Sequence, residues 1–225
     1  MVKQPVTCQD RMMRAAKRSS RVARHAARLL VAAAALAAVA SSSDASASRL
    51  AGPSAAGAAL VRAVAIQVAV RRWAQASTLH AAQVAAREAR SLVTGPHAGG
   101  LGAADGGAVD HRIRVGLLPG SDGTPGLANP GATGCVLSDV LGGSWANPRA
   151  RWAAALGRIN GWTPANNTFP GFPSHAQRIV GWATLTLRAR TLAQAHAYSG
   201  HATGHADVVV SALRDPAAHP CPADG

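Results

Sequence analysis

The chain has 225 residues, with 23 Lys or Arg against 10 Asp or Glu, and a net charge of +13 at pH 7. Glu88 is the only glutamate, which excludes catalysis by a pair of glutamates. From Ser48 onward 15 basic and 8 acidic side chains leave a net charge of +7, which favours a polyanionic partner. Large apolar side chains are scarce beside Ala and Gly, so a dense core is not expected. A GC-rich reading frame drifting without selection would give the same bias.

Residues 1–47 have the order of a secretory signal peptide. Basic residues between Arg11 and Arg28 precede an apolar run over 29–40, and Ala45-Ser46-Ala47 resembles a cleavage site. The leader therefore predicts secretion, with an organelle presequence or an intracellular protein with a merely basic helix as alternatives. The run is shorter than the roughly 20 residues of a membrane-spanning helix, so no transmembrane segment is expected.

The rest of the chain divides by composition. Residues 48–94 are predicted to be an Ala-rich helical segment, because 60–93 lacks Gly and Pro. Its arginines at 62, 71, 72, 87 and 90 are interpreted as a solvated face, with phosphate contact as the alternative. Residues 95–110 contain six glycines and are predicted to be a flexible linker. A domain over 111–215 and a Pro-rich tail over 216–225 follow. Cys135 and Cys221 either form a disulfide or remain two thiols.

Within 111–215 the pattern favours a mixture of strands and helices. Strands are predicted over 112–118, 133–140 and 177–181, and 151–156 is either a weaker strand or the start of a helix. A helix is predicted over 185–197, and 206–213 is the last periodic segment. Pro170, Gly171 and Pro173 exclude a helix between Thr168 and Ile179.

Short motifs in this region occur in an order similar to that of ribonuclease H domains from retroelement polyproteins. The matching residues are Asp122-Gly123, Asn129-Pro130-Gly131, Gly134-Cys135-Val136-Leu137, Trp152-Ala153-Ala154-Ala155, Asn166-Asn167-Thr168, Val180-Gly181-Trp182 with Leu185, Leu187 and Arg188, Gly200-His201-Ala202, and Ala206-Asp207. The resemblance implies an α/β fold: an incomplete ribonuclease H-like mixed sheet with helices, preceded by the Ala-rich helix.

The resemblance also implies a function. In that family, four carboxylates hold two Mg²⁺ ions that activate water and stabilise the leaving oxygen. Asp122 and Asp207 match two of these acids, as catalytic residues and metal ligands, and His201 matches a loop histidine that assists turnover. Phe169-Pro170 and Trp182 stand where the other two acids belong. The resulting prediction is a catalytically inactive relic that binds RNA, DNA or hybrids, with Asn166, Asn167 and Arg188 in contact with nucleic acid.

Two other functions stay open. The first is an active RNA–DNA hybrid ribonuclease that uses Mg²⁺. The second is an exported basic interaction or metal-binding protein, because His196, His201 and His205 lie close to Asp207. The spacing of His201 and His205 would place both on one helical face, but Gly200 and Gly204 argue against a helix there. Scattered solvated histidines are therefore the favoured interpretation.

Overall fold

The structure, a computed structural model, describes residues 54–101 and 113–216. The chain divides into two units at Ser48, and all described residues belong to the second. Their elements, in chain order, are α2 (Ala55–Ala74), α3 (Leu79–Thr94), the π-helical turn η2 (Val136–Leu141), α4 (Pro148–Asn160), the 3-10 turn η3 (Phe169–Gly171), α5 (His175–Arg188) and α6 (Leu192–Arg214). Over these ranges there is no strand, only an isolated bridge between Thr163 and Asn166. The prediction of an α/β fold with a ribonuclease H-like mixed sheet is therefore wrong, because the described part of the chain is helical.

Each α-helix of the described ranges begins at a side-chain cap. A hydroxyl or amide oxygen accepts a hydrogen bond from a backbone N–H three residues later, at Ser54, Thr78, Asn147, Ser174 and Thr191. Such a cap satisfies one of the backbone donors that a helix start leaves without an intrahelical partner. Thr78 also divides the Ala-rich segment, which is two helices and not one.

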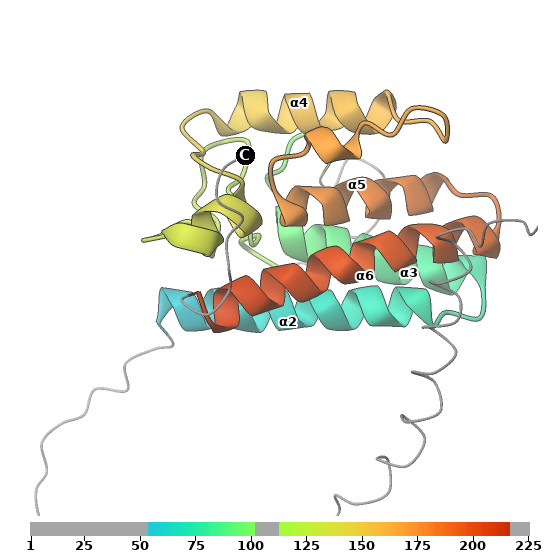
Figure 1. Cartoon of the computed structure of the whole chain (residues 1–225), viewed down its shortest axis with the longest axis horizontal. Coiled ribbons are helices and arrows are strands. Elements are labelled where there is room, and N and C mark those ends of the chain that lie inside the picture. The colour runs from blue at the N-terminus through green and yellow to red at the C-terminus, as the bar shows by residue number, and fades with distance from the viewer. Residues whose placement is uncertain (1–53, 102–112, 217–225) are drawn as a thin grey trace, which may run out of the picture. The chain divides into compact units, whose positions relative to one another are not determined.

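Four of the helices form a bundle. α2 packs against α3 and α6, and α5 packs against the same two helices (Figure 1). Short connections over 75–78 and 189–191 make each hairpin antiparallel. α4 lies outside the bundle against α5 (Figure 1). This arrangement determines which side chains of α3 and α6 meet those of α5.

The core combines alanines with a few large rings. Buried alanines line the inner faces of the bundle helices, including Ala63, Ala86 and Ala202. Trp73 is fully buried on α2, and its Nε1 donates to the carbonyl oxygen of Ala195 at 2.9 Å. Small side chains let the helices approach closely, and the rings fill the remaining space. A continuous buried core therefore forms despite the scarcity of large aliphatic residues.

The first expected strand, over 112–118, instead completes the end of α3. The backbone N–H groups of Leu117 and Leu118 donate to the carbonyl oxygens of Leu92 and Val93, at 3.1 and 3.0 Å. These carbonyls belong to the last turn of α3, where intrahelical donors are missing. Gly95 ends the helix with a φ of 64°, and a Cβ there would come within 2.5 Å of the Gly116 backbone nitrogen. The described part of this segment is thus held by a helix end and not by a sheet.

The other expected strands are helical turns. Part of 133–140 forms η2, and 177–181 lies within α5. For 151–156 the helical alternative is confirmed, because this segment lies within α4. In α5 the buried Ala176, Ile179, Val180 and Ala183 recur at helical spacing. Such a short apolar run does not distinguish a strand from a buried helix by periodicity alone. The expected helix over 185–197 is also wrong in its bounds, because α5 ends at Arg188 and Thr191 caps α6.

α6 continues through both glycines that argued against it. Gly200 and Gly204 lie inside Leu192–Arg214, and a Cβ at either position would meet nothing within 4 Å. A glycine inside a helix costs up to about 1 kcal/mol relative to alanine. Burial of Ala202, Ala206 and Val209 on the opposite face offsets that cost.

Two glycine substitutions test this packing in opposite directions. A Cβ at Gly181 of α5 would lie 2.8 Å from two ring carbons of Phe169, so Gly181→Ala is expected to destabilise the fold by about 1–3 kcal/mol. Gly204→Ala, in open space, is expected to stabilise it by roughly 0.5–1 kcal/mol. Urea unfolding of the two variants and the wild type measures both effects. A Gly181→Ala protein as stable as the wild type would contradict the described packing.

Candidate functional site

The two aspartates predicted to bind metal lie on separate elements with separate partners. Asp122, in the turn after Gly120, lies 3.1 Å from His97 Nδ1 and accepts a hydrogen bond from the Thr124 backbone N–H. That hydrogen bond is the main cause of a lowered pKa at Asp122. Asp207, on α6, accepts a hydrogen bond from Gln67 Nε2 at 2.7 Å and lies 3.8 Å from the Arg71 guanidinium of α2. Within 54–101 and 113–216, no three His, Cys, Asp or Glu side chains are placed to hold one metal ion.

The histidines of α6 point to different neighbours. His201 is exposed, and its ring stacks on Trp182 with the centroids 4.4 Å apart and the planes 13° apart. His196 Nε2 lies 2.9 Å from the carbonyl oxygen of Ala76. His205, one turn after His201, faces α5 instead. The alternative interpretation, in which His196, His201 and His205 gather with Asp207, is therefore not what the helix assembles.

His205 forms a close pair with a residue that sequence reasoning missed. Its Nδ1 lies 3.0 Å from Nδ1 of His175, the first residue of α5. The pKa of His205 is lowered to about 4, chiefly by burial and then by the nearby charges of His175, Arg178 and His201. The sequence signal would have been the Ser174 cap, which starts α5 at His175, but the partner depends on helix packing.

The asparagines expected to contact nucleic acid shape the loop between α4 and α5. Asn166 pairs through its backbone with Thr163, and the Asn167 side-chain oxygen accepts a hydrogen bond from the Phe169 N–H at 3.1 Å. Both are exposed. Arg188, the third expected contact, ends α5 and donates to the Asn160 side-chain oxygen of α4 at 3.1 Å. Among the described contacts, neither Asn166 nor Asn167 therefore shares a partner with Arg188.

Arg188 instead borders a pocket of about 210 Å³ between α3 and α5. Its lining side chains are Arg87, Thr184, Leu187 and Arg188, none of them acidic. This volume exceeds what a single water needs and is enough for a phosphate group. Two arginines from neighbouring helices therefore line one open cavity.

One donor of a side chain that lines this pocket is unused. Arg87 Nε is buried and has no hydrogen-bond partner in the described structure. A buried donor left unpaired costs free energy. Thr184 contributes no donor, because its hydroxyl donates to the Val180 carbonyl oxygen at 2.8 Å. The two arginines alone provide the cationic N–H groups of this site.

The surroundings of the pocket keep its charge positive. Glu88, next to Arg87, is bound by Arg72 of α2 at 2.5 Å. The end of α5 would place partly negative carbonyl oxygens here. Gln83 Nε2 donates to three of them, on Thr186, Leu187 and Ala189, at 3.2 to 3.5 Å. The arrangement is suited to an anion that accepts hydrogen bonds in the plane of a guanidinium.

Comparison with protein-family models, curated proteins and solved structures found no match to this chain. Among the described helices, none is long and apolar enough to cross a membrane. Cys135 is disulfide-bonded, and Cys8 and Cys221 lie outside the described residues.

The His205 environment predicts a specific dependence of stability on pH. The folded ring has a pKa of about 4, while the ring in the unfolded chain has the ordinary value near 6.5. Between these values the unfolded state binds more protons, so stability is full above about pH 6.5 and is lost as the pH falls toward 4.

Unfolding free energies from pH 7 to 4, with a chelator present, measure this effect. His205→Gln should show a shallower loss of stability over that interval, because no ring is left to protonate. His80→Gln, at an exposed position of α3, should keep the wild-type slope. Equal slopes for His205→Gln and the wild type would refute the assignment.

Proposed function

We propose that this protein binds the phosphate groups of nucleic acid, and that Arg87 and Arg188 bind one of these groups in the α3–α5 pocket. The observation that carries the proposal is a cavity lined by two arginines and no acidic residue, where Arg87 also has a buried Nε without a hydrogen-bond partner. Guanidinium groups match phosphate oxygens with two parallel hydrogen bonds, which makes arginine the better side chain for this contact.

The composition supports a polyanionic partner over a single small anion. Both lysines, Lys3 and Lys17, precede Ser48, so arginine provides all the strong cationic charge of the remaining chain. The net charge of +7 from Ser48 onward would attract a strand along more than one phosphate. Contacts to phosphate and sugar do not read bases, so we expect binding with little sequence preference.

The proposal is for binding and not for cleavage. A hybrid ribonuclease needs carboxylates that converge on its metal ions. Asp122 and Asp207 are each bound by their own basic partner, His97 and Arg71, on different elements. The relic and the active enzyme both required the ribonuclease H-like sheet, whereas phosphate binding requires only the two arginines.

Binding of labelled single-stranded RNA, single-stranded DNA and an RNA–DNA hybrid to the full chain tests the proposal. Fluorescence anisotropy over a range of salt concentrations should give an affinity that falls as salt rises. The variant with both Arg87→Gln and Arg188→Gln is expected to bind about tenfold more weakly, which corresponds to ~1.4 kcal/mol. Its salt slope should be smaller by about one, because one phosphate contact is lost.

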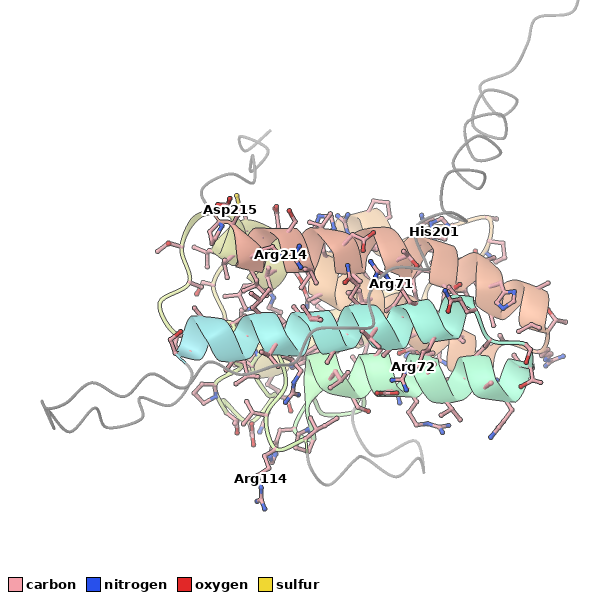
Figure 2. All side chains as sticks on the ribbon, turned by 90° about the horizontal axis from the view of Figure 1, so that it is seen from below. Arg71, Arg72, Arg114, His201, Arg214 and Asp215 are labelled. Atoms are coloured by element: carbon pink, nitrogen blue, oxygen red, sulfur yellow. The ribbon has the colours of Figure 1, made fainter. Side chains whose placement is uncertain are left out.

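Matched variants separate the pocket from general charge. Arg114 is exposed and does not line the pocket, and Figure 2 shows its side chain pointing away from the helices. Arg114→Gln removes this charge and should weaken binding much less. Arg87→Lys keeps the charge and loses the planar pair of donors, so an intermediate affinity is expected. Equal losses in Arg114→Gln and the pocket variants would contradict the pocket, and binding insensitive to salt would contradict phosphate recognition. Competition by inorganic phosphate as strong as that by a strand would assign the pocket to a small anion.

A further inference from the structure

The interface between α5 and α6 contains a pair of histidines, at the opposite end of α5 from the arginine pocket. His175 begins α5 and His205 lies on α6, and both rings are half-buried. Their Nδ1 atoms are 3.0 Å apart, and the rings are inclined at 63°. Two imidazoles from different helices thus bring the same ring nitrogen into close contact.

This separation has a particular meaning for metal coordination. Two nitrogens bound to Zn²⁺ at about 2.0–2.1 Å, with an angle of roughly 90–109° between the bonds, lie about 2.8–3.4 Å apart. The observed 3.0 Å falls inside that interval and is also the length of a hydrogen bond between the two rings. Without a metal, a contact between two ring nitrogens is favourable only if one carries a hydrogen and the other accepts it. A metal ion accepts lone pairs from both rings, with the hydrogen of each on Nε2.

We propose that His175 and His205 form an open binding site for a divalent transition metal ion of the Zn²⁺ class. Imidazole is a preferred ligand of zinc, copper and nickel. The described residues include no third His, Cys, Asp or Glu in a ligand position, so water completes the coordination. The site is independent of the nucleic-acid proposal, since it uses neither Arg87 nor Arg188.

The neighbours of the pair limit the ligand set to two. His201 is one turn before His205 on α6, but its ring lies flat on Trp182 and not toward His175. Arg178, one turn after His175, donates to the carbonyl oxygen of Phe172 at 3.0 Å and thus turns its guanidinium to the loop before α5. Its charge lowers the affinity for a cation without blocking the nitrogens.

Metal titration of the full chain tests the site. Zn²⁺ binding is measured by calorimetry, and Co²⁺ absorption reports the ligand type through bands without thiolate charge transfer. His175→Gln and His205→Gln should each lose one equivalent of bound Zn²⁺ relative to the wild type. His80→Gln, exposed on α3, and His201→Gln should keep that equivalent.

Three outcomes would overturn the proposal. One is an unchanged stoichiometry in both His175→Gln and His205→Gln. Another is loss of the equivalent in His201→Gln with retention in His175→Gln, which would assign the metal to the α6 histidines alone. The third concerns folding. Excess Zn²⁺ should raise the melting temperature of the wild type, because only the folded chain holds both rings together. No rise in the wild type would count against the site even if a histidine variant failed to fold.

Discussion

Close contact between helices rich in alanine is the constraint on which the described structure depends. Ala63 of α2, Ala86 of α3, Ala183 of α5 and Ala202 of α6 are all buried. Each contributes little apolar area alone, so the helices must approach closely to exclude water from their faces. Large rings then close the gaps where backbones separate, as Phe169 does against Gly181. Changes at these close contacts should be felt more strongly than changes on the exposed faces.

The antiparallel pairing of the helices places both candidate sites at the ends of α5. The middle of α3 lies beside the end of α5, so that Arg87 and Arg188 line the same pocket. The later part of α6 lies beside the beginning of α5, which brings His205 to His175. Neither site has a sequence motif, because its members are separated by 101 and by 30 positions. Such sites exist only while the bundle is folded, so ligand binding and stability are coupled.

The errors of the sequence interpretation have a common cause. Segments such as 177–181 are short and apolar, and the resemblance to ribonuclease H motifs favoured strands for them. The helix boundaries in this region depend on single capping residues. Ser174 starts α5, and Thr191 separates α5 from α6. The glycines of α6 were given too much weight, since burial of Ala202 and Ala206 exceeds their propensity cost. Arg188 was expected to contact nucleic acid, and it borders the pocket; Arg87 was counted with a solvated face.

The sequence by itself determined the basic charge, the Ala-rich helical character of 60–93 and the absence of a long apolar span in the part described. These properties depend on composition and on interactions between residues close together in the sequence, so the sequence alone is enough to predict them. Only the tertiary structure decided that the described residues form no sheet, that His175 lies against His205 and that Arg87 and Arg188 line one pocket. Short apolar runs are compatible with either secondary structure, and the contacts between distant residues depend on how whole helices pack.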